Sequence, residues 1–415
     1  MKLLLLASGL ESSKLDAAAG WTYELTARLA ARGHRVMVLC TEPLEPGEVA
    51  DDPPGVAVWR PRPDALAVAV KNALAKEPDL VHVAVTGPLA PEVVAALHGT
   101  PLLIDLLDWS PLCPLGDLVM RPRGSACEQH FPVAPCGSCA GHAHLSAMEP
   151  LLQLARGGHR VVAHTGFVRD RATLALGRGV ALVPVGVDTA RFTQSPSAPL
   201  APEVAALSAD RSHPRVLLIG PPTPARGGHR VLDLLIALHA RVPGIEMVVA
   251  GTDPGNPDAG HTLLAEAKEL GVSKQLTLLP RVARTDLPAL FTSVDVGMAP
   301  GLGPDALGLG VLQALASGLP VVGHVDGSMP AFLDQGRAGL LVNAAHSGLF
   351  ADTVALVLGD DAARAAMGEQ ARLAAIERHE LERAVFDTES LYERVRAPRG
   401  PRIPGLPPRV RRSAA

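Results

Sequence analysis

Short apolar segments alternate with helical patterns along most of the chain. The first such series begins with an apolar run at Lys2–Ala7, a helical pattern over Ala17–Arg32 and a second apolar run at Val36–Cys40. Short apolar runs separated by amphipathic helices are typical of buried parallel strands joined by helical crossovers. The pattern therefore predicts an α/β domain with a parallel sheet. Further strands of this sheet are expected at Val56–Arg60, Leu80–Val85, Leu102–Leu106, Arg160–Ala163 and Val180–Pro184.

A second series of the same kind begins at Arg215, after a proline-rich stretch. It predicts strands at Val216–Ile219, Met247–Ala250, Leu276–Leu279, Val294–Ala299 and Val321–Gly323, with helices at Val231–Arg241, Leu263–Leu270 and Leu309–Ala316. The two series predict two Rossmann-like, doubly wound domains that face a cleft, over residues 1–193 and 214–380, with a linker at 194–213. Ligands of such sheets bind beyond the carboxyl ends of the strands.

The C-terminal part of the chain shows two long helical patterns, at Ala362–Arg378 and Leu381–Val395. We expect the last helix, over 381–397, to pack back toward the first domain. Residues 398–415 are rich in Arg and Pro and contain no acidic residue, which predicts a disordered basic tail.

Composition narrows the functional class. Hydrophobic residues make up 47% of the chain and charged residues 19%, which favours folded cores over disorder. The 38 Lys and Arg nearly balance the 42 Asp and Glu, so binding to nucleic acid through bulk positive charge is excluded. No uninterrupted apolar run reaches the roughly 18–20 residues that a transmembrane helix needs. The apolar start at Met1–Ala7 is too short for a signal peptide. We therefore expect a cytoplasmic protein with at most a peripheral membrane contact.

Four of the five cysteines lie close together in the sequence. Cys113, Cys127, Cys136 and Cys139 have the spacing C-x13-C-x8-C-x2-C in a segment rich in Pro and Gly. The pair Cys136-x2-Cys139 has the chelate spacing of structural zinc, and four thiolates fill a tetrahedral site. A structural zinc site and four reduced thiols are both consistent with this pattern. Redox use of the pair is less favoured, because the pair does not open a helix in a thioredoxin-like βαβ unit.

Several motifs, taken in their order, resemble glycosyltransferase family 4, whose members have the GT-B fold. The resemblance covers roughly residues 1–395. It rests on Ala19–Trp21, Asp108–Pro114, Val183–Asp188, Val248–Gly251, Ala314–Val322 and Gly339–Val342. It implies transfer of a sugar from a nucleoside diphosphate sugar to an acceptor hydroxyl with retention at the anomeric carbon, without a catalytic metal. It does not identify the acceptor, which could be a saccharide, a lipid-linked molecule or a small molecule.

The resemblance also implies which residues bind the donor diphosphate. Gly20 matches the family's first glycine turn, where the backbone can approach a phosphate. Arg226 stands where the family has a phosphate-binding Lys, and its guanidinium can bind phosphate through two hydrogen bonds. Pro221 stands where the family has an Arg, so one of two expected cations is missing.

The family's acidic pair, E-x7-E, corresponds to Asp305 and Gln313. Asp305 is expected to contact the hydroxyls of the donor sugar, and Gln313 the ribose. Leu309 and Gly310, which lie between them, are expected to line the donor site.

In the first domain the family's His-Asp is Leu107-Asp108 here, so we expect Asp108 on the acceptor side. Asp108 and Asp305 are thus the catalytic candidates. Because the expected His, Arg and Glu are Leu107, Pro221 and Gln313, the alternative is a non-catalytic GT-B-like protein that binds a nucleotide sugar or a partner. A sugar-nucleotide 2-epimerase shares the architecture but fits the motif order less well.

Overall fold

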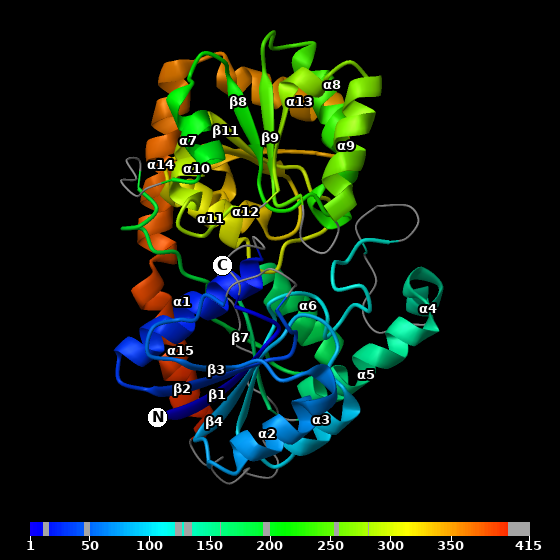
Figure 1. The fold of residues 1–415 in the computed structure, drawn as a ribbon, viewed down its shortest axis with the longest axis vertical. Helices are drawn as coiled ribbons and strands as arrows, with labels where there is room; N and C mark the ends of the chain where they lie inside the picture. Colours follow the sequence, from blue (N-terminus) through cyan, green and yellow to red (C-terminus); the bar gives the residue numbers. More distant parts are fainter. Residues whose placement is uncertain are drawn as a thin grey trace, which may run out of the picture.

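Two parallel β-sheets, each flanked by helices, form the two halves of the molecule (Figure 1). The structure is a computed structural model, and it describes residues 1–10, 16–44, 50–120, 127, 135–157, 159–193, 200–252, 257–280 and 282–396. Within these residues the first sheet has the strand order β3-β2-β1-β4-β5-β6-β7 and the second the order β10-β9-β8-β11-β12-β13. The two doubly wound domains predicted from the sequence are therefore present.

The first domain contains the strands β1 (Lys2–Ala7), β2 (Arg35–Cys40), β3 (Ala57–Trp59), β4 (Leu80–Ala84), β5 (Leu102–Asp105), β6 (Arg160–Ala163) and β7 (Ala181–Leu182). Its helices are α1 (Ala17–Ala31), α2 (Leu66–Leu74), α3 (Pro91–Leu97), α4 (Pro135–Ala140), α5 (His142–Arg156) and α6 (Gly166–Leu176). The run Leu3–Leu6 in β1 is fully buried, because helices cover both faces of the sheet.

The second domain contains β8 (Arg215–Leu218), β9 (Glu246–Ala250), β10 (Leu276–Leu279), β11 (Val296–Ala299), β12 (Val321–His324) and β13 (Gly339–Val342). Its helices are α7 (Pro202–Ala209), α8 (Val231–His239), α9 (Pro257–Glu269), α10 (Leu287–Thr292), α11 (Leu309–Ala316), α12 (Met329–Phe332), α13 (Ser347–Leu358) and α14 (Asp361–His379). The predicted linker 194–213 contains α7, which packs against α10, so this part of the linker belongs to the second domain.

The last helix, α15 (Leu381–Arg396), crosses from the second domain to the first (Figure 1). It packs against α1, β4 and β5. Arg32, the residue directly after α1, donates hydrogen bonds to two acids of α15, at 2.7 Å to Glu382 and 2.6 Å to Glu389. The tail predicted at 398–415 lies outside the described residues.

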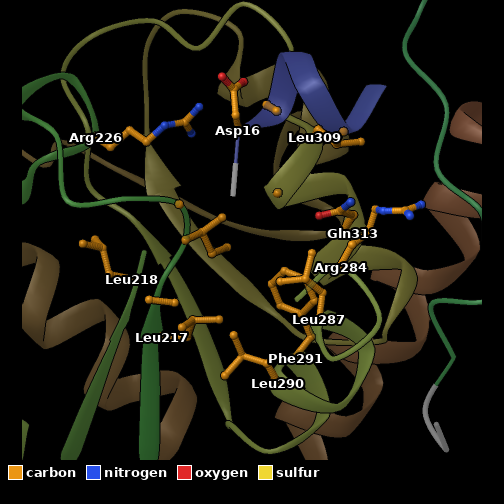
Figure 2. Close-up of a pocket in the computed structure, with 16 residues that line it drawn as sticks. Asp16, Leu217, Leu218, Arg226, Arg284, Leu287, Leu290, Phe291, Leu309 and Gln313 are labelled. Atoms are coloured by element: carbon orange, nitrogen blue, oxygen red, sulfur yellow. The ribbon is translucent and has the colours of Figure 1, made fainter. Parts of the chain in front are cut away.

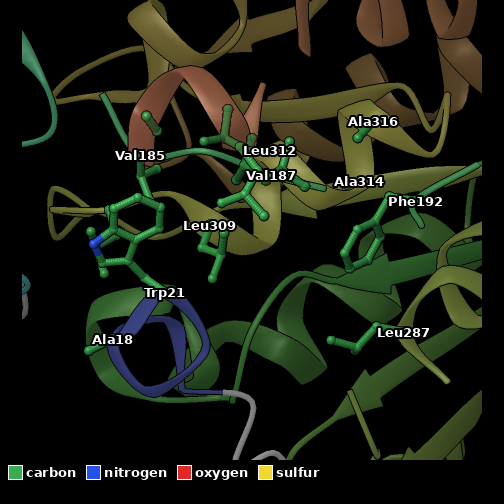
Figure 3. Close-up of a cluster of buried hydrophobic side chains, with 14 of the residues drawn as sticks. Ala18, Trp21, Val185, Val187, Phe192, Leu287, Leu309, Leu312, Ala314 and Ala316 are labelled. Atoms are coloured by element: carbon green, nitrogen blue, oxygen red, sulfur yellow. The ribbon is translucent and has the colours of Figure 1, made fainter. Parts of the chain in front are cut away.

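A hydrophobic cluster joins the two domains. Figure 3 shows part of it, in which Trp21 of α1 lies beside Val185 of the first domain and Leu309 of the second. All three side chains are at most 5% exposed. This cluster places the start of α1 against α11, next to the carboxyl ends of the strands of the second sheet. Among the helices of the described chain, none is both long and apolar enough to span a bilayer.

Candidate functional site

Two adjoining cavities lie between the domains. The first, called here the inner pocket, encloses about 690 Å³. Its wall is largely apolar and includes Leu217, Ile219, Leu287, Leu290 and Phe291 (Figure 2). The second, called here the outer cleft, encloses about 1120 Å³. Asp16, Ala17 and Arg226 line both, so the two cavities meet at these residues.

The donor residues expected from the sequence lie around the inner pocket. Gly20, Arg226, Leu309, Gly310 and Gln313 line it, whereas the sixth expected donor residue, Asp305, lines the outer cleft. In Figure 2, Arg226 and Asp16 lie at one end of the pocket, and the apolar side chains of α10 lie at the other. The pocket therefore offers a cation at its mouth and an apolar wall beyond it.

An ion pair occupies the junction of the two cavities. Arg226 follows β8, and Asp305 lies in the loop before α11; Arg226 Nη1 is 2.7 Å from Asp305 Oδ2. The other oxygen of Asp305 accepts hydrogen bonds from the backbone N–H groups of Leu307 (3.1 Å) and Gly308 (3.0 Å). Burial acts to raise the pKa of Asp305, but the Arg226 charge and these N–H groups hold it below its ordinary value. Asp305 is therefore a carboxylate at neutral pH.

The local backbone fixes the position of Arg226. Gly220 at the end of β8 has φ +87°, and a Cβ there would lie 2.9 Å from the Arg226 Cδ. The absence of a side chain at Gly220 thus lets Arg226 fold over the strand end. Pro221, the next residue, lines the outer cleft and has no cationic side chain.

Asp108 lies on the first-domain side of the outer cleft, next to Leu107. Its Oδ2 accepts a hydrogen bond from the Ser110 hydroxyl at 2.5 Å, and its Oδ1 accepts one from the Ser110 N–H at 2.8 Å. Burial raises the pKa of Asp108 to about 7, and the nearby acids Asp16 and Asp117 act in the same direction against the Ser110 hydrogen bonds. Asp108 can therefore exchange a proton near neutral pH, as a general base or acid must.

The structure corrects the prediction for Gly20. Gly20 lies inside the first turns of α1, and its N–H donates to the Asp16 carbonyl oxygen at 2.9 Å, so no glycine turn is present. A Cβ at Gly20 would lie 3.1 Å from Leu309 Cδ2. Glycine here allows α1 to approach α11 closely.

Asp16 is a cavity residue that sequence reasoning missed. Its Oδ1 caps α1 by accepting from the N–H groups of Ala18 (2.7 Å) and Ala19 (3.4 Å). An Asp directly before a helical pattern is a helix-start signal that could have placed it at the cleft.

Arg284 is a second residue that was missed. It lines the inner pocket, stacks 3.4 Å from the Tyr23 ring centroid and donates to Glu24 at 3.1 Å and Asp51 at 3.0 Å. These partners belong to the first domain, more than 200 positions away in the sequence, so no local pattern reveals the contact.

Two hydrogen bonds join the domains. Trp109 Nε1 donates to the Pro304 carbonyl oxygen at 2.7 Å. The hydroxyls of Thr165 and Ser328 lie 2.9 Å apart and are buried. Together with Arg284, these contacts hold the domains in a closed arrangement around both cavities.

The predicted zinc site gains no support. Cys113, Cys127, Cys136 and Cys139 are all among the described residues, where no three Cys, His, Asp or Glu side chains form a group that could hold a metal. Cys113 and Cys136 are instead packed in the apolar core of the first domain, and burial raises the pKa of the Cys113 thiol. Cys136 and Cys139 both lie on the short helix α4, which is followed by a second helix, α5.

Known proteins identify the family. Residues 205–374 match the family model described as Glycosyl transferases group 1. The chain is also 31% identical over 278 residues to a GDP-mannose-dependent alpha-(1-6)-phosphatidylinositol monomannoside mannosyltransferase of Mycobacterium tuberculosis, over 65% of this chain and 70% of that protein. The chain belongs to the group 1 glycosyl transferases. It is 30% identical over 158 residues to a D-inositol 3-phosphate glycosyltransferase of Corynebacterium glutamicum, which is 38% of each protein.

Solved structures show the same fold. Sucrose-phosphate synthase of Thermosynechococcus elongatus superposes with a TM-score of 0.71 at 17% identity, over 95% of this chain and 99% of that one. HepE of Anabaena, in complex with UDP and glucose, gives a TM-score of 0.70 at 18% identity, over 95% and 100%. The GT-B fold predicted from the sequence is thus confirmed. Family membership makes sugar transfer the reaction class, and the relatives give no support to the non-catalytic alternative.

Proposed function

We propose that the protein transfers a hexosyl group from a nucleoside diphosphate sugar to an acceptor hydroxyl, with retention, as a family 4 enzyme. The observation that carries the proposal is the Arg226–Asp305 ion pair at the junction of the two cavities. A guanidinium beside a carboxylate offers a cation to a diphosphate and an acceptor of hydrogen bonds to the hydroxyls of the attached sugar.

The donor binds in the inner pocket under this proposal. Arg226 contacts the diphosphate at the mouth of the pocket, and Asp305 contacts the sugar. Gln313 accepts hydrogen bonds from the ribose through its amide oxygen. Leu309 and Gly310 contact the nucleoside part of the donor. Gly20 of α1 lines the same part of the pocket and, having no side chain, leaves room for the donor.

The acceptor enters through the outer cleft. The bond between the anomeric carbon and the diphosphate oxygen breaks, and negative charge collects on the leaving diphosphate. Arg226 stabilises that charge, because a fixed cation in a partly buried site interacts more strongly than it does in water. Asp108, on the opposite wall, orients the attacking hydroxyl and takes up its proton when ionised.

Three positions of this site differ from the pattern of glycosyltransferase family 4. Pro221 and Leu107 line the outer cleft without offering a charge, and Gln313 is neutral. The donor therefore depends on Arg226 more than it would in a site with two cations. Substitution of Arg226 is therefore expected to weaken donor binding strongly.

The experiment is a binding screen with nucleotide sugars that includes GDP-mannose, the donor in the name of the mycobacterial relative. At least one nucleotide sugar is expected to raise the melting temperature of the native protein, and Asp305→Asn to reduce the shift. Proton NMR of the product then reports whether the anomeric configuration of the donor is kept. Inversion contradicts retention, and no shift with any nucleotide sugar contradicts the donor site.

A further inference from the structure

A buried chain of polar side chains runs beneath the outer cleft in the first domain. The Tyr392 hydroxyl of α15 lies 2.8 Å from His82 Nδ1, and His82 Nε2 lies 3.1 Å from Asp105 Oδ2. The other oxygen, Asp105 Oδ1, lies 2.7 Å from His164 Nε2. All four side chains belong to residues that are at most 4% exposed.

The hydrogen-bond partners of His164 indicate that its ring is positively charged. Nε2 faces the Asp105 carboxylate, and Nδ1 faces the Val183 carbonyl oxygen at 2.7 Å. Both partners only accept hydrogen bonds, so both ring nitrogens carry a proton and the ring is an imidazolium. Burial acts to lower the pKa of His164, but Asp105 and the Val183 carbonyl raise it above its ordinary value.

The remaining groups of the chain are Asp105, His82 and Tyr392. Burial acts to raise the pKa of Asp105, but His164 and His82 hold it well below its ordinary value. His82 Nε2 hydrogen-bonds to Asp105, and His82 Nδ1 hydrogen-bonds to the Tyr392 hydroxyl. Burial raises the pKa of Tyr392, and the nearby acids act in the same direction, so its hydroxyl stays protonated. The Asp105 carboxylate thus faces the His164 imidazolium.

One side of this ion pair leads to the outer cleft and the other to a contact between the domains. Asp105 is the last residue of β5, and Asp108 follows three positions later on the cleft wall. His164 directly follows β6, and the next residue, Thr165, caps α6 and hydrogen-bonds to Ser328 of the second domain. The pair therefore ties together the ends of the two strands that present Asp108 and Thr165.

The pair also contacts the wall of the inner pocket. The His164 ring lies 5.7 Å from the Trp21 ring at an interplanar angle of 71°. Trp21 belongs to α1, whose residues Ala17 and Gly20 line the pocket. Two segments that line the cavities, and one that joins the domains, thus contact one buried charge pair.

We propose that Asp105 and His164 form a permanently ionised positioning pair that holds Asp108, Thr165 and α1 in the arrangement required for transfer. The inference rests on the proposed function and adds that the rate depends on charges outside the cavities. Neither residue lines either cavity, so the pair acts through the segments that it fixes.

The test compares Asp105→Asn with the control Tyr392→Phe, which removes one hydrogen bond at the far end of the same chain. Both are assayed at a temperature at which circular dichroism shows them folded. Asp105→Asn is expected to lower kcat at least tenfold with the donor KM within threefold, and Tyr392→Phe to keep kcat within twofold. Asp105→Asn with native kcat, or equal losses in both variants, overturns the proposal.

A second measurement needs neither turnover nor a folded Asp105→Asn. Nitrogen-15 NMR of the native protein at pH 8 is expected to show both ring nitrogens of His164 protonated, with the signal assigned through its loss in His164→Gln. A ring with one bare nitrogen overturns the ionised pair. Absence of turnover by the native protein with every donor contradicts the proposed function instead, so the two failures are distinguishable.

Discussion

Replacing Arg226 by Ala removes the cation at the mouth of the inner pocket. A hydrogen bond to a charged group contributes roughly 1.5–3 kcal/mol. In the free protein Arg226 pairs with Asp305, and the two side chains are 28% and 17% exposed. If the diphosphate replaces Asp305 as the partner of Arg226, the native protein loses about 0.5 kcal/mol from this partly exposed pair, which offsets part of the gain in binding free energy. The net loss of about 1–2.5 kcal/mol predicts that the Kd for the nucleoside diphosphate rises roughly 5- to 70-fold in Arg226→Ala.

Isothermal titration calorimetry with UDP and GDP measures this change. Arg241→Ala is a matched control, because Arg241 is 31% exposed, pairs with Asp352 and lies outside both cavities. The control is expected to bind like the native protein, and Arg226→Lys to lie between the native protein and Arg226→Ala, since Lys keeps the charge but not the planar fork. Affinity within twofold of native in Arg226→Ala would refute the placement of the diphosphate.

Three further predictions follow from the same geometry. Burial raises the pKa of Asp108 to about 7, above the ordinary carboxyl value, so the fold favours the protonated form. The free energy of unfolding is therefore expected to fall between about pH 4 and pH 7 and then to level off. Urea titrations of Asp108→Asn should lack this fall. Gly20→Ala is expected to lower the melting temperature in thermal unfolding, because its Cβ would lie 3.1 Å from the buried Leu309 Cδ2 and this contact outweighs the helix-propensity gain of up to about 1 kcal/mol; a raised melting temperature would contradict the close packing of α1 on α11. Pro221→Arg is expected to tighten nucleoside diphosphate binding roughly tenfold in calorimetry by adding a second cation to the cleft, and unchanged affinity would contradict the assignment of that position.

The sequence predicted the strands well, because buried parallel strands appear as uninterrupted apolar runs. The run Lys2–Ala7 matches β1, and Leu276–Leu279 matches β10 residue for residue. Helices were harder to predict where only a small part of the helix surface is apolar. The pattern missed α5, whose N-terminal half is exposed.

The candidate site was predicted in part. The family resemblance assigned Arg226 and Asp305 to the same donor site, and the two residues are 79 positions apart in the chain and 2.7 Å apart in space. Gly20 was assigned to a turn because it matches the family's first glycine turn, but it lies within α1, which Asp16 caps. The Arg284 contacts and the Asp105–His164 pair depend on how distant strands and helices meet, which no local pattern encodes.

The zinc prediction shows a different limit. The spacing of the cysteines shows which of them are close along the chain. It does not determine whether their side chains point toward one another. Cys113 and Cys136 pack in the apolar core instead of converging on a metal with the other two cysteines. Elemental analysis of protein purified without added metal is expected to find no stoichiometric zinc.

The most direct test of sugar transfer is the rate at which the purified protein releases nucleoside diphosphate from a panel of nucleotide sugars, with and without candidate acceptors. We predict release from at least one nucleotide sugar by the native protein, at least a tenfold lower rate in Asp305→Asn, and a native rate in Arg241→Ala. Equal rates in the native protein and Asp305→Asn, or no release with any donor and acceptor, would contradict the account.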